Sequence, residues 1–555
     1  MMKTVKQFKC KNSHDDKIII YYESQICGFL KTFKKQVIKK TIWTIVFLFV
    51  GQFVIQAQPS VIPQPLIMHV TSDQLLSINS VLYIVYDSKL AGEANLLSQN
   101  IKKVTGIDVK FVHTPPKTKT SSINTIYLKL DKTTSSDVES YQLQINNKGV
   151  VIIGSDAAGI FYGGVTLQQL LNPTTKDKKQ WQLPFVEIQD KPRFGWRGLM
   201  LDCSRTFISS EYLKKTIDRM AFYKMNTLHL HLTDDQGWRL EIKKYPLLTS
   251  KGAFFAANYN EPKEFEGFYT QAQMKELINY ARQRHVEIVP EIEVPGHSHA
   301  ALYAYPALSC SRNITPIYPF SSGPSMTTND VFDVGNENTY HFFKEVIKEV
   351  AEIFPSPYIH LGGDEVREGA WKDCKNCQAK MKSLGISDQK HLQGYVMNRV
   401  GNYVVADNKR PIGWDEVFQT GVGKETVIMV WRQQQTGIKA TKDGYDVVMC
   451  PTSHLYFDYD YSTTNTKKVY SYQPVPADAT SEEKKHYLGI QACFWSHIDR
   501  TESKIDYQLF PRLLALAERA WSDEDVNDYN NFATRKSNHT FWLNYFDIKY
   551  NRNAE

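Results

Sequence analysis

The sequence predicts a (β/α)8 barrel, or TIM barrel, preceded by a small α+β domain. From Arg193 onward, eight apolar segments of strand length alternate with helical segments, which is the pattern of a barrel of parallel strands. Polar and aromatic residues follow these apolar segments, and such barrels carry their chemistry where the strands end. We therefore expect a leader at residues 1–57, the α+β domain at 58–190 and the barrel with its chemistry at 191–555.

Composition and charge are those of an ordinary globular protein. Apolar residues make up 42% and charged residues 23% of the 555 positions, which excludes a mostly disordered or fibrous chain. The net charge of +7 is confined to residues 1–40, which contain ten lysines and three acidic residues. Because the rest of the chain is neutral and has no basic run, we expect no nucleic-acid partner.

The first 57 residues are expected to direct export. An apolar stretch at residues 42–50 follows Lys39 and Lys40 and is too short for a typical membrane span. It is typical of the apolar part of a secretory signal peptide, with residues 55–57 as the cleavage site, although the basic region before it is long. We expect a periplasmic, outer-surface or secreted protein, with a retained membrane anchor as the alternative.

The α+β domain is predicted from four strands and one helix. Val, Ile and Tyr are enriched in the strand segments, which are residues 81–86, 125–130, 141–145 and 150–153. A helix is expected at residues 159–171, where Ile160, Leu167 and Leu171 share one face and Pro173 follows the end. Nothing in this domain suggests chemistry.

The barrel is predicted from eight strands and the helices between them. The strands are expected at residues 198–202, 227–232, 287–291, 358–362, 411–414, 426–431, 446–450 and 488–495. Helices are expected after Ser209, after the capping box of Thr270 and Gln273, over residues 342–354 and over residues 506–521. The polar ends of these strands should therefore meet at one rim of the barrel.

Asp364 and Glu365 are the sharpest candidates for catalysis. Adjacent strand residues point to opposite faces, but Gly362 and Gly363 would free the backbone to turn both carboxylates into one site. Two carboxyl groups held close together differ in pKa, so that one is ionised while the other keeps a proton. Glycoside cleavage needs this acid and base pair. The alternative is an acidic N-terminus of a helix.

Three tryptophans at strand ends favour a sugar. Trp414, Trp431 and Trp495 occupy equivalent positions, where their rings would stack on the faces of a pyranose. One such tryptophan alone would be assigned to core packing, whereas three at equivalent positions favour a binding pocket.

Two patterns raise the question of a metal. His229 and His231 point to one face of their strand and would be either a metal pair or two hydrogen-bonded interior residues, and we favour the interior interpretation. Further ligands would have to come from later strand ends, where the nearest histidines are His297, His299 and His360. Cys374 and Cys377 are a weak zinc signal without a second pair, and a short disulfide or two plain thiols is the favoured interpretation.

The ordered motifs resemble glycoside hydrolase family 20, the β-N-acetylhexosaminidases. Two of them read Pro290-Glu-Ile-Glu-Val-Pro-Gly-His297 and His360-Leu-Gly-Gly-Asp-Glu-Val366, and the others are residues 197–205, 224–238 and 511–521. The resemblance covers the chain from about residue 60 to Trp521 and includes a non-catalytic α+β domain before the barrel. It implies hydrolysis of terminal β-linked GlcNAc or GalNAc on a glycan or chitooligosaccharide, with no metal and no organic cofactor.

The resemblance also implies a substrate-assisted, retaining mechanism in which the 2-acetamido oxygen of the substrate is the nucleophile. Glu365 would protonate the leaving oxygen and then activate water, Asp364 would hold the acetamido N–H, and Tyr456 would hydrogen-bond the acetamido oxygen. The remaining implied contacts are the sugar hydroxyls for Arg205 and Asp458, the support of the acid and base for Asp234 and His297, and the pocket wall for Trp414, Trp431 and Trp495.

One residue departs from the family pattern, since His497 stands where members often have a glutamate that binds the O4 and O6 end of the sugar.

Two other functions remain as alternatives. A metal-dependent amidohydrolase would use His229 and His231, and a catalytically inactive sugar-binding protein would keep the tryptophans without turnover.

Overall fold

The computed structural model describes residues 59–78, 81–113, 124–133, 137–173, 181–311, 313–320 and 330–554. The expected leader lies outside these residues, so export and a membrane anchor stay predictions. Within the described ranges, no helix combines the length and the apolar character that crossing a membrane requires.

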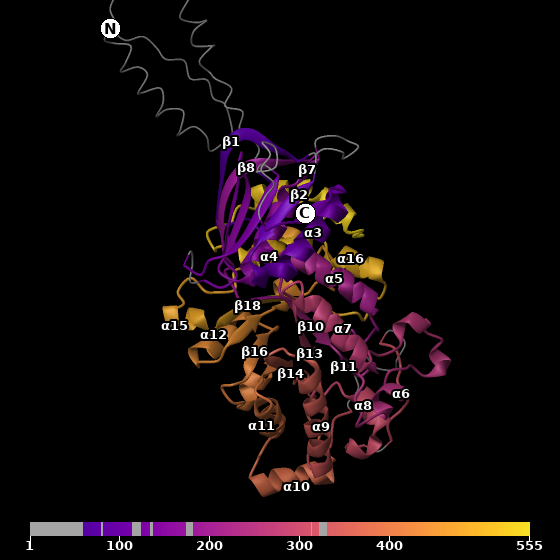
Figure 1. Ribbon diagram of the computed structural model, residues 1–555. Helices are drawn as coiled ribbons and strands as arrows, with labels where there is room; N and C mark the ends of the chain where they lie inside the picture. The colour runs from indigo at the N-terminus through magenta and orange to yellow at the C-terminus, as the bar shows by residue number, and fades with distance from the viewer. Residues whose placement is uncertain are drawn as a thin grey trace, which may run out of the picture. The chain divides into compact units, whose positions relative to one another are not determined.

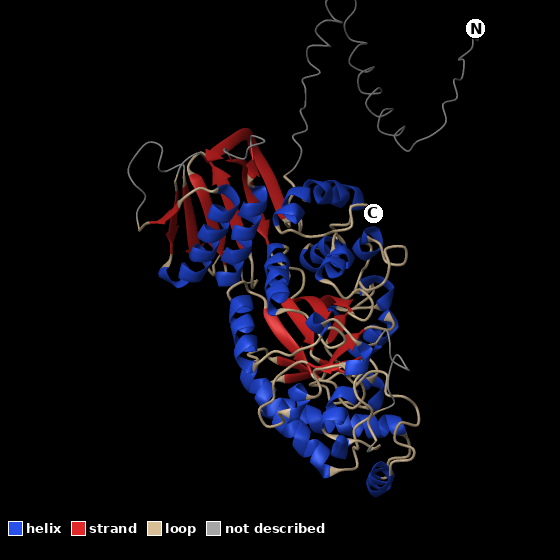
Figure 2. Ribbon diagram, turned by 90° about the vertical axis from the view of Figure 1, so that its right-hand side faces the viewer, coloured by secondary structure: helices blue, strands red, loops and turns tan. Residues whose placement is uncertain are grey.

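A mixed sheet with helices on one face forms the small domain (Figure 2). The strand order is β1 (Ile67–Ile78), β8 (Trp181–Asp190), β5 (Tyr141–Asn146), β6 (Gly149–Gly154), β4 (Thr125–Leu130), β2 (Leu82–Tyr86) and β3 (Val109–Phe111), with β7 (Asn172–Pro173) beside β8. The helices are α3 (Ala91–Thr105), α4 (Ala157–Leu170) and the short 3₁₀ helix η1 (Ser88–Leu90). The four predicted strands and the predicted helix are all present, and the Asp156 side chain begins α4 by accepting a hydrogen bond from Gly159 N.

Sequence patterning did not indicate the first and last strands of this domain. Strand β1 alternates poorly, because most of its side chains are exposed or half-buried. Strand β8 contains Pro184, which cannot donate a ladder hydrogen bond and argues against a strand. In the structure, Pro184 pairs with Leu75 of β1 next to a register shift between Ser72 and Leu75, where the ladder is already interrupted.

Eight parallel strands close into a barrel, which confirms the predicted fold class (Figures 1 and 2). In order around the barrel they are β10 (Thr227–His231), β13 (Glu287–Glu291), β14 (Tyr358–His360), β15 (Arg410–Trp414), β16 (Val427–Val430), β17 (Val447–Met449), β18 (Tyr487–Phe494) and β9 (Trp196–Asp202). Their residues are almost all buried, because helices cover the outside and side chains fill the inside.

Helices connect the strands and add to the loops. The longer ones are α5 (Ser210–Phe222), α7 (Gln271–Arg282), α9 (Glu337–Ile353), α11 (Gln389–Ala406), α12 (Gln434–Lys442), α16 (Glu502–Leu509), α17 (Arg512–Trp521) and α18 (Tyr529–Asn538). Another helix of similar length is α10 (Lys375–Leu384), and the shorter ones are α6 (Leu247–Ser250), α8 (His299–Ala304), α13 (Thr452–Leu455), α14 (Thr466–Tyr470), α15 (Ser481–Lys485) and α19 (Thr540–Tyr545). The predicted capping box of Thr270 and Gln273 is present at α7. The single helix predicted over residues 506–521 is wrong: it is two helices, because Pro511 lacks the N–H that would continue the first one.

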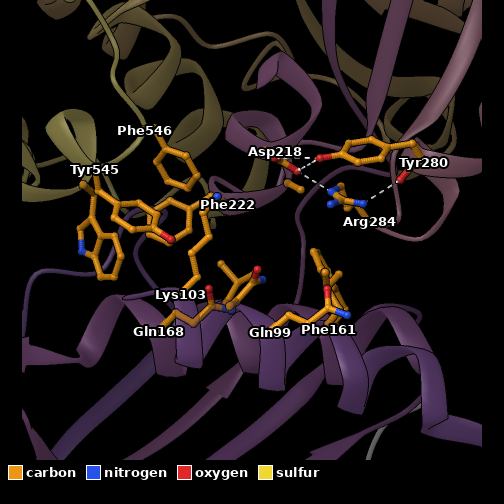
Figure 3. A pocket seen from close by; sticks show the side chains of 15 residues that line it. Gln99, Lys103, Phe161, Gln168, Asp218, Phe222, Tyr280, Arg284, Tyr545 and Phe546 are labelled. Atoms are coloured by element: carbon orange, nitrogen blue, oxygen red, sulfur yellow. Dashed lines mark hydrogen bonds and ion pairs between the residues drawn. The ribbon is translucent and has the colours of Figure 1, made fainter. Parts of the chain in front are cut away.

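A cavity of about 190 Å³ lies between the helices of the small domain and those of the barrel (Figure 3). Its lining comes from α3, α4, α5, α19, and α7 with the turn that follows it. Figure 3 shows Asp218, Tyr280 and Arg284 facing one another there, and the Tyr280 hydroxyl donates to Asp218 at 2.9 Å. No strand end contributes to this lining, so the cavity is not at the rim where the chemistry is expected.

A buried ion pair joins the small domain to the barrel. Lys224 Nζ lies 2.8 Å from Asp190 Oδ2, and both side chains are almost fully buried. Tyr141 and Trp521 also donate to the Asp190 carboxylate, at 2.6 Å and 3.0 Å. Every partner of this carboxylate is a hydrogen-bond donor, which is the arrangement that a buried charge requires.

We expect Asp190→Ala to lower the free energy of unfolding by about 3–5 kcal/mol, because it leaves the Lys224 ammonium buried without a carboxylate to balance its charge. Urea denaturation and the melting temperature measure this loss. The control is Asp108→Ala, which removes an exposed pair with Lys102 and should change stability little. Equal losses in the two variants would contradict the role of burial.

Candidate active site

The candidate site lies where the barrel strands end, and its centre is the segment after β14. That strand ends at His360, and Gly362 and Gly363 then take φ values of +64° and +91°. Glu365 also has a positive φ of +48°. The next helix, α10, begins only at Lys375, so the two carboxylates do not belong to the N-terminus of a helix.

Gly362 is required by a close contact as well as by its backbone conformation. A Cβ atom at this position would lie 1.8 Å from Oε2 of Glu293, which is buried below the turn. Only glycine permits this approach, and the resulting turn takes the chain out of strand alternation.

Both carboxylates of the turn face one imidazole. His297, in the loop after β13, places Nε2 3.5 Å from Asp364 Oδ2 and 3.6 Å from Glu365 Oε2. The Asp364 residue is only 9% exposed, whereas the Glu365 side chain is 51% exposed. One carboxylate is therefore enclosed by protein, while its neighbour reaches the opening of the site.

On its other side, His297 contacts a series of side chains whose charges alternate in sign. Its Nδ1 lies 3.4 Å from Asp234 Oδ1, and the other Asp234 oxygen lies 2.9 Å from the Arg205 guanidinium. Arg205 also contacts Asp202, at the end of β9, at 3.3 Å. Four residues from three different strand ends thus form a continuous ion-pair network.

The opposite charges in this network determine its pKa values. Burial opposes the charge of His297, but Asp234 and Asp364 raise the pKa of this imidazole well above its usual range. Burial would raise the pKa of Asp234, but Arg205 and His297 outweigh it and hold that pKa well below its usual range. His297 is therefore a cation, and Asp234 is an anion.

Asp364 and Glu365 are shifted in opposite directions. Burial raises the pKa of Asp364 to about 6, although the His297 cation opposes this shift. The contact with His297 lowers the pKa of Glu365, against a smaller effect of burial. Below about pH 6, the proton of the pair in the free protein therefore resides on Asp364.

The buried Glu291 carboxylate is the centre of a second network under the site. His360 Nδ1 lies 2.9 Å from Oε1, and the Trp414 indole donates to the same oxygen at 2.7 Å. On the other side, His229 lies 3.2 Å from Oε2, and His231 contacts the same oxygen. Both histidines of the predicted H-x-H pair are thus interior residues in contact with a carboxylate.

Aromatic rings form one wall and the floor of the site. Trp431 and Tyr456 stack with ring centroids 6.1 Å apart, and Trp495 lies 6.3 Å from Tyr456. Trp431 and Trp495 are partly exposed, whereas Trp414 is only 1% exposed and lies 5.9 Å from Trp495. The structure thus brings the three predicted tryptophans together, with Trp414 beneath the other two.

Two further predicted residues lie at the edge of this aromatic group. Burial raises the pKa of Asp458 to about 7, and its Oδ1 atom has no hydrogen-bond partner among the described residues. His497 packs against Phe320, with ring centroids 4.9 Å apart. Burial, with help from Arg205, lowers the pKa of His497 to about 4, so this side chain is neutral where a glutamate would be an anion.

Two residues that hold the site together had no role predicted from the sequence. Glu291 belongs to the motif at residues 290–297, but only the barrel register places it between His231 and His360. Glu416 accepts a hydrogen bond from the Trp431 indole at 2.9 Å, and burial raises its pKa to about 8. Its position directly after the strand that ends at Trp414 was the signal that could have identified it.

The family comparison matches nearly all of the described chain. Residues 194–524 match glycosyl hydrolase family 20, catalytic domain, and residues 58–191 match domain 2 of the same family.

Curated relatives carry the name β-hexosaminidase. The protein of Porphyromonas gingivalis is 35% identical over 511 residues, which cover 88% of this chain and 64% of that protein. The protein of Vibrio furnissii is 36% identical over 403 residues, which cover 69% of this chain and 65% of that protein. The chain therefore spans slightly less than two thirds of the length of these two relatives.

Solved structures of enzymes from the same family are similar to this chain over most of its length. The exo β-N-acetylglucosaminidase of Vibrio harveyi in complex with N-acetylglucosamine has a TM-score of 0.80 and 31% identity, covering 89% of this chain and 78% of that one. The β-N-acetylhexosaminidase of Streptomyces coelicolor has a TM-score of 0.76 and 27% identity, covering 89% and 97%.

We expect Gly362→Ala to destabilise the protein more than Gly369→Ala does. Both positions have a positive φ, which costs an alanine about 1–2 kcal/mol. Only at Gly362 does the new Cβ also strike Glu293, adding about 1–3 kcal/mol of overpacking. Urea unfolding of the two variants measures the difference, and equal losses would argue against the close contact.

Proposed function

Because the chain belongs to glycosyl hydrolase family 20, we propose that it is an exo-acting β-N-acetylhexosaminidase that removes terminal β-linked GlcNAc or GalNAc with retention of configuration. The observation that carries the proposal is the pair of Asp364 and Glu365 on one side of the His297 cation, beside a wall of aromatic rings. The names of the relatives agree with this activity.

In the proposed first step, the substrate supplies its own nucleophile. The 2-acetamido oxygen attacks the anomeric carbon while Glu365 gives its proton to the leaving glycosidic oxygen. Asp364 accepts a hydrogen bond from the acetamido N–H and stabilises the positive charge of the oxazolinium ring that forms. Its buried Oδ1 atom has no hydrogen-bond partner in the described chain, as such a role requires.

In the second step, Glu365 is the base. It takes a proton from water, whose oxygen attacks the anomeric carbon and opens the oxazolinium ring to restore the acetamido group. Glu365 returns to its protonated form for the next cycle. The exposure of its side chain, 51%, gives it access to both the leaving group and water.

Substrate binding has to reverse the order of the two carboxyl pKa values. In the free protein below about pH 6, the proton is on Asp364 and Glu365 is ionised. A bound sugar covers Glu365 and removes water from it, which raises its pKa, while the acetamido N–H favours the ionised form of Asp364. The pair carries one proton before and after binding, and the substrate moves it to the group that donates it.

The surrounding residues would hold the sugar. Trp431 and Trp495 would stack on the ring, Trp414 would form the floor, and Tyr456 would bond the acetamido oxygen. Arg205 and Asp458 would bind hydroxyls, and the neutral His497 would replace a charged acceptor by a group that accepts or donates one hydrogen bond. The substrate would be a glycan or chitooligosaccharide that ends in N-acetylhexosamine.

We further propose that the protein is exported. The support is the sequence of residues 1–57, in which a basic region precedes a short apolar stretch and a small-residue cleavage site.

The activity is tested with aryl β-glycosides. We expect turnover of aryl β-GlcNAc and aryl β-GalNAc, and almost none of aryl β-glucoside, because the glucoside lacks the acetamido nucleophile. A thiazoline analogue of the cyclised intermediate should inhibit tightly. Efficient glucoside turnover, or a trapped ester between sugar and protein, would exclude substrate assistance, and binding without turnover of any glycoside would indicate an inactive sugar-binding protein.

We expect Glu365→Gln to reduce kcat by roughly 10²–10⁴-fold, as loss of a general acid does. Aryl glycosides with very good leaving groups should lose less, because their leaving oxygen needs less protonation. The matched control is Glu368→Gln, an exposed carboxylate in the same loop, which should leave the kinetics unchanged. Equal losses for all leaving groups would show that Glu365 is not the proton donor.

The pH dependence should report the single proton of the carboxyl pair. As pH rises through the pKa of Asp364, about 6, the free protein loses this proton, so kcat/KM should fall above that pH. The fall in kcat should occur at higher pH, because the bound sugar raises the pKa of Glu365. His297 remains a cation throughout, since its pKa is raised. A kcat/KM that stays level from about pH 5 to about pH 8 would contradict this assignment.

A further inference from the structure

Four side chains with metal-binding atoms converge away from the carboxyl pair. They are Cys310, Asp333, Cys374 and Cys377, and one ligand atom from each lies within 4.8 Å of all the others. Asp333, Cys374 and Cys377 are buried, and Cys310 is half-buried. The sequence showed only the close pair Cys374 and Cys377, because the other two residues come from distant parts of the chain.

The start of α10 and the segment that packs against it position these residues. Cys374 is the N-cap of α10 and Cys377 lies in its first turn, so both cysteines belong to the N-terminal end of this helix. Gly335 packs against this turn so closely that a Cβ atom would lie 2.1 Å from the Asn376 carbonyl carbon. The segment before α9, which carries Asp333, is therefore pressed against the start of α10.

Asp333 is oriented with one oxygen toward the thiols. Asn376 Nδ2 donates to Oδ2 of Asp333 at 2.6 Å. The other oxygen, Oδ1, lies 3.5 Å from Cys374 Sγ and 3.4 Å from Cys377 Sγ. The Sγ atoms of Cys310 and Cys377 are 3.6 Å apart.

The two S···O distances and the S···S distance match edges of a tetrahedron around a zinc ion. With Zn–S bonds of about 2.3 Å and a Zn–O bond of about 2.0 Å, tetrahedral geometry gives S···S edges of about 3.8 Å and S···O edges of about 3.5 Å. A disulfide would use only two of the four groups and would leave the buried Asp333 carboxylate facing sulfur atoms. Three thiolates and one carboxylate are a ligand set that Zn²⁺ accepts.

We propose that Cys310, Asp333, Cys374 and Cys377 bind one structural zinc ion. All four positions of the tetrahedron come from the protein, so no position is open for a substrate or for water, as in structural zinc sites. Cys310 and Asp333 belong to the connection after β13, which also carries His297. Cys374 and Cys377 belong to the connection after β14, which also carries Asp364 and Glu365. The ion ties together the two loops that hold the carboxyl pair and its cation.

Metal analysis of the purified full-length chain, without regard to activity, tests this proposal. We expect one zinc ion per chain in the wild type, measured by plasma mass spectrometry after expression with zinc in the medium. The double variant Cys374→Ser/Cys377→Ser should lose it. Two controls should retain it, namely Cys450→Ala, which removes a buried thiol outside the cluster, and Cys10→Ser/Cys27→Ser, which removes the thiols of the leader.

A second measurement uses the wild-type chain alone and covers the case in which the double variant does not fold. Replacement of the metal by Co²⁺ should give thiolate-to-cobalt charge transfer and the strong visible bands of a tetrahedral site, and zinc should compete them away. Removal of zinc by a chelator should lower the melting temperature. A wild-type chain without zinc, zinc retained by the double variant, or a disulfide between any two of these cysteines would overturn the proposal.

Discussion

The candidate site depends on the contacts that surround the buried carboxylate of Glu291. It is fully buried at the end of β13, where an ionised group is tolerated only if donors surround it. The indole of Trp414 donates to it, His231 is hydrogen-bonded to it, and His229 and His360 lie against it; these residues come from β10, β14 and β15. One charge in the barrel thus connects four strands at the level from which the active-site loops depart.

The balance between burial and nearby positive charge also determines which carboxyl groups of the site are ionised. Buried carboxyls that face cations remain ionised, as Asp234 does beside Arg205 and His297. Carboxyls without enough positive charge nearby have raised pKa values, as in Glu293 and Glu416. Asp364 lies between these cases, because the His297 cation only partly offsets its burial. A small change in hydration or hydrogen bonding therefore suffices to move the proton of the pair, and in the proposed mechanism a bound sugar supplies such a change.

The loops around the carboxyl pair are positioned by close packing. The turn at Gly362 and Gly363 exists because no side chain fits above Glu293. Further along, Gly335 allows the start of α10 to lie against the segment of Asp333. Glycines at two close approaches therefore let the connections after β13 and β14 come together, and the proposed zinc ion acts at the second of them.

The sequence by itself determined the barrel, the α+β domain and the candidate residues of the site. Strand and helix periodicity, a capping box and polar strand ends are local signals, and local backbone geometry decides them. Strands β1 and β8 were not predicted, because the exposed side chains of β1 and Pro184 of β8 hide the alternation that indicates a strand. Pairing with each other and with β5 stabilises these two segments as strands.

Tertiary structure alone decided which atoms meet. The register of neighbouring strands brings Glu291 to His231 and His360, and packing of distant loops brings Cys310 and Asp333 to Cys374 and Cys377. Burial and the neighbouring charges then set the protonation states, because the fold alone removes water from these carboxyl groups and places the cations beside them.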